Sequence, residues 1–221
     1  QYLDDLPLHL ESESAVVQIA QGTYGVDPAR TKEVLAKVIA ATKQDAVRQQ
    51  AQEIINQIER FDDYIVVWQV SGPYTKDVQA NELFDAPFAP EQEGQQAEWK
   101  AMPVGTTPES PWLIEPDKVE GLKGDARVAY LRTRISSPKE QKAVIELGSD
   151  DGVKVWLNGQ LVHQNNAERP VQPGQDKADV TLKEGVNTVL VKLTQGGGQW
   201  AMCVRFRAPD GGKLEGLKVE P

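Results

Sequence analysis

The sequence has little of the chemistry from which thiol and zinc sites are built. Its 221 residues contain one cysteine, Cys203, and two histidines, His9 and His163. A single cysteine cannot form an internal disulfide, and two histidines beside it do not complete a Cys/His zinc site. Neither histidine lies in a motif that would make it the base for a cysteine nucleophile. A disulfide-stapled scaffold is therefore excluded, and thiol catalysis is not expected.

Long apolar runs and an excess of positive charge are also lacking. No stretch approaches the roughly 18 apolar residues of a membrane-spanning helix. The net charge is -9, from 33 acidic and 24 basic residues, and a surface of that sign repels phosphate backbones and anionic lipid. We therefore expect neither a nucleic-acid partner nor membrane insertion. The chain opens without Met or the regions of a signal peptide, which suggests a processed piece of a longer protein.

Motifs of catalysis are missing from the sequence as well. It contains no G-x-S-x-G, no H-E-x-x-H and no glycine-rich phosphate loop. The run GGG at 196–198 is interpreted as a hairpin turn between two strands. Glycosidase chemistry needs two acids about 5–10 Å apart beside a cleft, and no pattern ties a pair of acids to one. We predict a protein that is not an enzyme.

What the sequence does contain is a change of period near residue 62. Residues 13–60 carry a helical period with two apolar stripes, and Asp27 followed by Pro28 provides an N-cap and a first helical position. Members of the stripes are Val34, Leu35, Val38 and Ile39 in the first, and Val47, Ala51, Ile54, Ile55 and Ile58 in the second. We expect a helical segment over 1–62, with its helices packed antiparallel.

From residue 63 onward the period becomes two, as in strands. Short runs separated by Gly, Pro, Asn and Asp predict a mainly β domain over 63–221, an antiparallel β-sandwich of the jelly-roll type. The expected strands are 64–72, 127–136, 142–149, 152–159, 176–183, 187–195 and 199–208. Residues 75–125 are poorly patterned, but Phe84, Phe88, Trp99 and Trp112 predict a loop pinned onto the sandwich edge.

Two motifs carry a family resemblance. The run GVKVWLNGQLV is a hairpin around Asn158-Gly159, the preferred type I′ pair. With the downstream run ADVTLKEGVNTVLVKLTQ, in which Glu184-Gly185 makes a turn, it resembles the galactose-binding-like jelly rolls of bacterial glycoside hydrolases and surface proteins. The run DAVRQQAQEII resembles the second helix of a HEAT-type repeat; the alternative is an unrelated helical hairpin. The resemblance implies a bacterial, extracytoplasmic chain whose other domains act on or near polysaccharide.

The stretch LGSDDGVKVWLNGQLV, residues 147–162, separately resembles the SDDG core of protective-antigen-type modules. In the lectin members two successive acids hold a calcium ion that contacts sugar hydroxyls, and Asp150 and Asp151 correspond to them. The alternative is a solvent-exposed hairpin turn, because Asp and Gly are favoured turn formers. Calcium needs 6–8 oxygens, so further ligands would have to come from Asn165, Asn166, Asp176 or Asp179.

Alternation also predicts an outward-facing tryptophan. Val153, Val155 and Leu157 share one side of their strand, which puts Lys154, Trp156 and Asn158 on the other side. An exposed Trp can stack on the apolar face of a sugar ring while polar neighbours bind its hydroxyls. The alternative is that the 75–125 segment or the helices cover Trp156.

The strand RVAYLRTRIS adds Tyr130, Arg132 and Arg134 to the same outward side. If these faces belong to one sheet, they form a platform suited to an anionic polysaccharide; the alternative is an outer face of mutually paired charges. We therefore predict a non-catalytic carbohydrate-binding module of an exported protein. The competing hypothesis is a structural domain that braces a catalytic module and has no ligand of its own.

Overall fold

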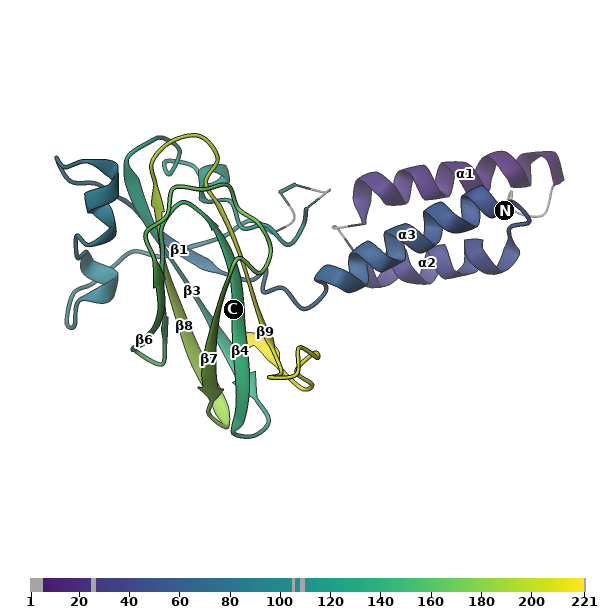
Figure 1. The fold of residues 1–221 in the computed structure, drawn as a ribbon. Helices are drawn as coiled ribbons and strands as arrows, with labels where there is room; N and C mark the ends of the chain where they lie inside the picture. The colour runs from purple at the N-terminus through teal and green to yellow at the C-terminus, as the bar shows by residue number, and fades with distance from the viewer. Residues whose placement is uncertain (1–5, 25–26, 105, 108–109, 221) are drawn as a thin grey trace. The chain divides into compact units, whose positions relative to one another are not determined.

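The fold is taken from a computed structural model that describes residues 6–24, 27–104, 106–107 and 110–220. Three helices precede a region rich in strands (Figure 1). The helices are α1 Leu6–Thr23, α2 Pro28–Ala41 and α3 Asp45–Phe61. The strands are β1 Gln69–Tyr74, β2 Lys100–Ala101, β3 Arg127–Ser137, β4 Gln141–Asp150, β5 Val153–Leu157, β6 Gln160–Asn165, β7 Asp176–Leu182, β8 Gly185–Gln195, β9 Ala201–Arg207 and β10 Lys218–Glu220.

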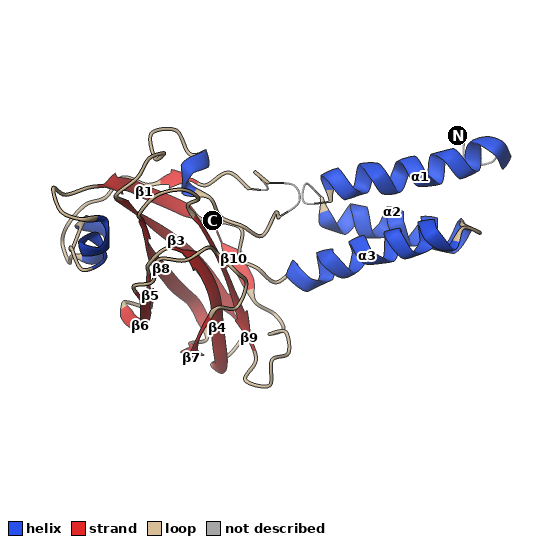
Figure 2. Cartoon of the chain, turned by 45° about the horizontal axis from the view of Figure 1, so that its top comes forward, coloured by secondary structure: helices blue, strands red, loops and turns tan. Residues whose placement is uncertain are grey.

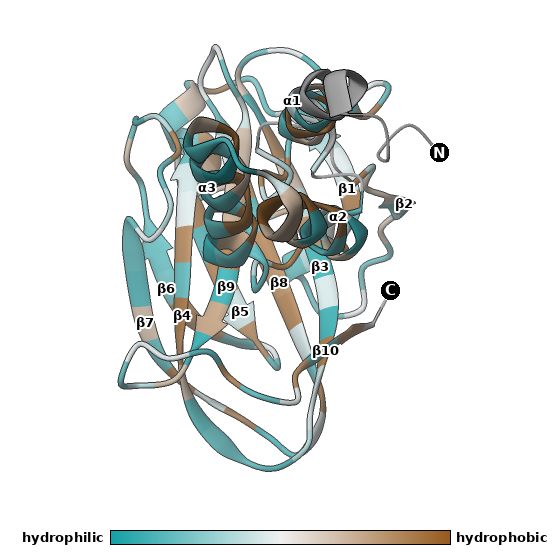
Figure 3. Ribbon diagram, turned by 90° about the vertical axis from the view of Figure 1, so that its right-hand side faces the viewer, coloured by the Kyte–Doolittle hydropathy of each residue, from teal (hydrophilic) through white to brown (hydrophobic). Residues whose placement is uncertain are grey.

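The helices form around the apolar stripes seen in the sequence. The side chain of Asp27 caps α2 by accepting a hydrogen bond from the backbone N–H of Arg30 at 3.0 Å, and Pro28 opens the helix, as predicted. The hydropathy colours alternate along α2 and α3 (Figure 3). Buried between the helices are Val17, Ala20, Leu35, Val38, Val47, Ala51, Ile54 and Ile58. Val34 departs from the prediction, because it lies 37% exposed beside the buried Leu35.

Two antiparallel sheets make the β-sandwich (Figure 2). The large sheet has the order β2-β1-β3-β8-β5-β6, with β10 also paired to β3, and the small sheet has the order β7-β4-β9. Strands alternate between core and surface, so that Val153, Val155 and Leu157 of β5 face inward. The mainly β, antiparallel sandwich with N-terminal helices that the sequence predicts is confirmed.

Apolar side chains of both sheets fill the space between them. Trp68 and Trp200 are 2% and 0% exposed and lie in this core, as their alternation predicts. Ile145 and Leu147 of the small sheet meet Val191 of the large one in the same cluster. Burying a side chain of this size contributes about 1.5–3 kcal/mol. This core is what makes the outer faces of the sheets rigid surfaces.

Three of the turns named in the sequence analysis connect strands of different sheets. The SDDG stretch leads from β4 in the small sheet to β5 in the large one. The turns before Gly185 and at 196–198 likewise join β7 to β8 and β8 to β9, again across the two layers. Of the turns named in the sequence, Asn158-Gly159 joins neighbouring strands, with φ of 53° and 82°. These values fit the type I′ turn predicted there.

A segment between β1 and β2 packs on the outside of the large sheet. It contains two short 3₁₀ helices, Ala80–Phe84 and Ala89–Glu91, and we call residues 80–99 the covering segment. Leu83 and Phe88 are buried against Val128 and Tyr130 of β3, so the loop is pinned as predicted, but on the face of the large sheet and not on its edge. Trp112 behaves differently from the expectation, because its ring stacks on Phe61 of α3 with centroids 4.6 Å apart.

The chain divides into two compact units. The helices, with a short segment ending at Trp112, form one unit; Tyr64–Val104 and Leu113–Pro221 form the other. Each has its own buried apolar cluster. In the described part of the chain, no helix is both long and apolar enough to cross a membrane.

Candidate functional site

The outer face of the large sheet is organised in rows, because the strand register aligns side chains across β3, β8 and β5. Side chains opposite one another in an antiparallel pair lie close enough to touch. The rows are Tyr130, Lys192 and Lys154; then Arg132, Leu190 and Trp156; then Arg134, Thr188 and Asn158. Four residues that the sequence predicts as sugar contacts thus stand in two adjacent rows: Arg132, Arg134, Trp156 and Asn158.

The first row is hidden beneath the covering segment. Tyr130 is 0% exposed, and its hydroxyl donates to Oε1 of Glu91 at 2.6 Å. The Nζ of Lys192, also 0% exposed, binds the same carboxylate at 3.0 Å and the carbonyl of Ala86 at 2.6 Å. The prediction that Tyr130 faces solvent is therefore wrong. A buried ring cannot stack on a glycan, so Tyr130 is removed from the candidate site.

Burial also shifts the pKa values of Tyr130 and Lys192 in that first row. Burial, followed by the hydrogen bond to Glu91, raises the pKa of the Tyr130 hydroxyl far above its ordinary range. Burial lowers the pKa of Lys192, and the neighbouring carboxylate of Glu91 opposes that effect. Lys192 and Glu91 therefore act as a structural pair that holds the covering segment on the sheet.

The second and third rows are open to solvent. Arg132, Arg134 and Thr188 are exposed, whereas Trp156 is half-buried. Its neighbour Leu161 on β6, which pairs with Trp156, is 42% exposed. We call the open surface the outer strip; it comprises Gln69, Arg132, Arg134, Thr188, Leu190, Trp156, Asn158 and Leu161. One end of the outer strip is basic and polar, and the other end is apolar.

Arg132 is held in place at the basic end. Its Nε donates to Oε1 of Gln69 at 2.8 Å, and its guanidinium lies 4.1 Å from the ring centroid of Trp99. Partial burial, followed by repulsion from Arg134, lowers the pKa of Arg132 below its ordinary value. A hollow of about 390 Å³ adjoins these groups, lined by Val67, Trp68, Gln69, Arg132, Thr133, Arg134 and Thr188. It is within the range of small-molecule sites.

Asn158 has a structural function. Its Nδ2 donates to Oδ1 of Asn187 at 2.9 Å, and its Oδ1 accepts the backbone N–H of Thr188 at 3.0 Å. These bonds fasten the β5–β6 hairpin to β8. An asparagine amide carries two N–H donors, so one remains for a ligand at the edge of the outer strip.

The outer face of the small sheet carries paired charges instead. Glu146 binds Arg205 at 2.7 Å and Lys177 at 2.6 Å. Although burial disfavours its charged form, the hydrogen bonds from these two cations hold the pKa of Glu146 below its ordinary value. Arg205 does not share the face of Arg132, because β9 and β3 lie in different sheets.

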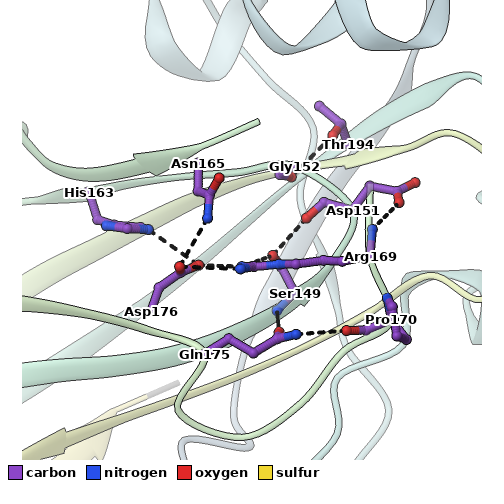
Figure 4. A network of polar contacts seen from close by, with 10 residues as sticks. All are labelled: Ser149, Asp151, Gly152, His163, Asn165, Arg169, Pro170, Gln175, Asp176 and Thr194. Carbon is purple, nitrogen blue, oxygen red and sulfur yellow. Dashed lines mark hydrogen bonds and ion pairs between the residues drawn. The ribbon is translucent and has the colours of Figure 1, made fainter. Parts of the chain in front are cut away.

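The SDDG stretch connects the two sheets, and hydrogen bonds to other parts of the chain hold it in place (Figure 4). The carboxylate of Asp151 accepts the backbone N–H groups of Arg169 at 3.2 Å and Gly196 at 2.7 Å. Ser149 donates its hydroxyl to the carbonyl of Asp151 at 2.7 Å. Asp150 is 7% exposed, and burial together with the charge of Asp151 raises its pKa to about 6.

Two of the residues that could complete a calcium shell, Asn165 and Asp176, are engaged with each other. Asp176 accepts Nδ2 of Asn165 at 3.0 Å and forms an ion pair with Arg169, and Nε2 of His163 lies 3.4 Å from its carboxylate (Figure 4). Although burial opposes the charged form, Arg169 and Asn165 hold the pKa of Asp176 below its ordinary value. Within the described residues, no group of three or more His, Cys, Asp or Glu side chains could hold a metal ion. Asp150 and Asp151 thus gain no third acidic ligand there.

Several residues of the outer strip escaped the sequence analysis. Gln69, Thr188, Leu190 and Leu161 lie on three different strands, β1, β8 and β6. Alternation alone could have placed Leu161 outward, in phase with Trp156 across the hairpin. The others depend on strand order and register, which no local pattern specifies.

Comparisons with known proteins find similar solved structures but no matching family. No family model matches the chain, and no curated protein matches it. Similar solved structures include a PA14 sugar-binding domain from an RTX adhesin, at 13% identity and a TM-score of 0.42 over 71% of this chain and 95% of that one. Others are an anti-sigma factor domain-containing protein from Clostridium clariflavum (9%, 0.44, 71% and 48%) and a β-glucosidase from Kluyveromyces marxianus in complex with glucose (13%, 0.38, 65% and 15%).

This chain therefore spans less than half of the Clostridium clariflavum protein and a small part of the β-glucosidase. With TM-scores below 0.5 for all three, these resemblances carry no argument about a ligand. The outer strip has to be interpreted from its own residues.

Proposed function

We propose that the chain is a non-catalytic carbohydrate-binding domain and that the outer strip is its binding surface. The observation that carries this proposal is one row of the sheet in which Arg132, Leu190 and Trp156 lie side by side on an open face. The pairing of β3, β8 and β5 fixes the relative positions of these three residues. The covering segment contacts Leu190 and, through Trp99, Arg132, but leaves Arg132 exposed.

The chemistry of the row suits a sugar chain. A pyranose ring has an apolar face of C–H groups and a rim of hydroxyls, which calls for an aromatic or aliphatic surface next to hydrogen-bonding groups. Trp156 and the 42% exposed Leu161 supply the first. Gln69, Arg132 and Thr188 supply the second. A sheet face of this kind suits a polymer that extends across several strands.

The wider setting is proposed from the sequence motifs. The galactose-binding-like and SDDG resemblances favour an exported bacterial protein in which this domain accompanies other domains acting on polysaccharide. The helical unit is then the HEAT-like end of a solenoid, residues 1–62, and the sandwich begins at 63. Calcium remains outside this proposal, since Asp151, Asn165 and Asp176 are already bound within the chain.

The test is Trp156→Ala in the full chain, measured by calorimetric titration against neutral and anionic polysaccharides. We expect at least one polysaccharide to bind, and its affinity to fall about 10-fold or more in the variant, because stacking on the Trp ring is lost. Trp156→Phe keeps an aromatic face and should retain much of the affinity. Unchanged melting temperatures of both variants would show that the sandwich is intact.

A structural brace is the second candidate, and the hidden first row favours it. There the chain already covers its own sheet with Leu83 and Phe88, so the exposed Leu161 could belong to a surface that packs on another domain. If no polysaccharide binds the wild-type chain in the titration, the binding proposal is wrong and the brace is the better account.

A further inference from the structure

Arg132 differs from several other cations on the two outer faces, which form ion pairs with carboxylates. In the described part of the chain its contacts are the hydrogen bond to Gln69 and the stack on Trp99, and no carboxylate lies within ion-pair distance. Four of these cations are paired: Lys192 with Glu91, Lys154 with Asp85, and both Lys177 and Arg205 with Glu146. Among the described residues, this guanidinium is therefore without a carboxylate partner.

The two contacts of Arg132 also orient it. Gln69 takes the Nε–H, and the ring of Trp99 fixes the plane of the guanidinium. The two terminal Nη groups have no hydrogen-bond partner in the described structure, and they present a planar fork. Such a fork matches the two oxygens of a carboxylate or sulfate. Because the side chain is already ordered, little conformational entropy is lost on binding.

The surroundings of the fork favour an anion as well. Arg134 lies two residues along the same face of β3, and repulsion between the two guanidinium groups contributes to the lowered pKa of Arg132. An anion placed between them would relieve that repulsion. The adjoining hollow of about 390 Å³ is lined by Thr188 and Gln69, whose polar groups can bind hydroxyls of the same sugar.

We propose that the outer strip recognises acidic glycans, with the carboxylate or sulfate of one sugar on Arg132 and the face of another sugar on Trp156. The inference rests on the proposed function and specifies its ligand class. Arg132 and Trp156 are two strand spacings apart, about 10 Å. This separation exceeds one pyranose ring, so both contacts require a chain of sugars.

The experiment compares a polyuronate with its neutral ester. Calorimetric titration of the full chain with polygalacturonate and with fully methyl-esterified polygalacturonate isolates the carboxylate, since the two polymers share one backbone. We expect the acid to bind about 10- to 100-fold more tightly than the ester. Arg132→Gln should weaken binding of the acid far more than binding of the ester, so that the preference for the acid is lost. Arg132→Lys should keep part of the preference, because it retains charge but loses the fork.

Two controls belong to this comparison. Lys139→Gln removes an exposed positive charge from the turn between β3 and β4 and should not alter the preference. A sulfated galactan and its desulfated form repeat the comparison with sulfate as the anion. A preference for the sulfated polymer that Arg132→Gln abolishes would also support the inference, with sulfate as the recognised group.

The outcomes separate this inference from the proposed function. If the wild-type chain binds neutral polymers as tightly as acidic ones, or if Arg132→Gln keeps the preference, acidic recognition is wrong while carbohydrate binding stands. If neither the acidic nor the neutral polymers bind, both proposals are wrong. Melting temperatures of the Arg132 variants equal to that of the wild type would show that the loss is local.

Discussion

Asp150 lies almost completely buried at the end of β4, beside the carboxylate of Asp151, and its pKa is raised to about 6. Two other carboxylates have the opposite shift: the pKa values of Glu146 and Asp176 are held low by cations that bind them directly. The shifts differ in direction because the carboxyl group of Asp150 lies beside another carboxylate, whereas those of Glu146 and Asp176 lie beside cations. At the scale of single residues, ionisation of Asp150 therefore opposes folding.

This ionisation should appear in the pH dependence of stability. The unfolded chain releases the proton of Asp150 near pH 3.9, whereas the folded chain keeps it up to about pH 6. Between these values the folded state binds more protons, so this group makes the free energy of unfolding fall as pH rises. Asp150→Asn removes the effect and should stabilise the chain at pH 7 by about 1–3 kcal/mol.

Urea unfolding at pH 4 and pH 7 checks this prediction. The gain from Asp150→Asn should be present at pH 7 and nearly absent at pH 4, where the carboxyl is largely protonated in the folded state. Glu140→Gln, at an exposed position, serves as the matched control and should change little at either pH. An equal gain at both pH values would contradict the assignment to ionisation.

At the scale of elements, the β5–β6 hairpin carries the apolar end of the outer strip. Its turn has positive φ at Asn158 and Gly159, and the Asn158 side chain ties it to β8. The bonds set the position of Trp156, two residues before the turn. The element is thus built by local turn chemistry and fixed by a neighbouring strand that is distant in sequence.

Two glycine substitutions should have opposite effects on stability. A Cβ at Gly159 or at Gly22 would meet no atom within 4 Å, so neither change creates a clash. At Gly159 the φ of 82° disfavours alanine, and Gly159→Ala should cost about 1–2 kcal/mol. Gly22 lies within α1, where Gly22→Ala should stabilise by about 0.5–1 kcal/mol. Urea unfolding of both variants measures the change in the free energy of unfolding. A loss of stability in Gly22→Ala would contradict the argument.

At the scale of the whole molecule, the helical unit and the sandwich each have an apolar core of their own in the described part of the chain. Leu35 is 0% exposed in the helical unit, and Ile145 is 0% exposed in the sandwich. No residue belongs to both clusters among those described. The stability of each unit is therefore determined mainly by its own core.

Core truncations should act on one unit each. Leu35→Ala and Ile145→Ala each remove a fully buried side chain, which costs about 2–5 kcal/mol. Native-state hydrogen exchange should show lost protection in the helices for Leu35→Ala and in the strands for Ile145→Ala. If either variant lowers protection equally in both units, the two cores unfold together and the prediction is wrong.

Local chemistry determined much of this protein. The helical stripes, the Asp27 cap, the Asn158-Gly159 turn and the alternation that turns Trp156 outward all follow from contacts between residues close in sequence. They sufficed to predict a β-sandwich and to select Arg132, Arg134, Trp156 and Asn158 as outward-facing residues, whereas whether their strands share one sheet was left open. The reason is that side-chain direction within one strand depends only on the period of two.

Strand pairing and layer assignment were decided by the tertiary structure. The turns at SDDG and 196–198 look like hairpin turns in sequence, yet they cross between sheets, because a turn's residues do not specify which strand pairs beside it. Tyr130 is a second example. Its place in the alternation points it out of the sandwich, but it is buried, because residues about 40 positions earlier in the chain, including Glu91, pack over it. Contacts between distant segments bring Arg132 beside Gln69 and Trp99, and no local pattern contains them.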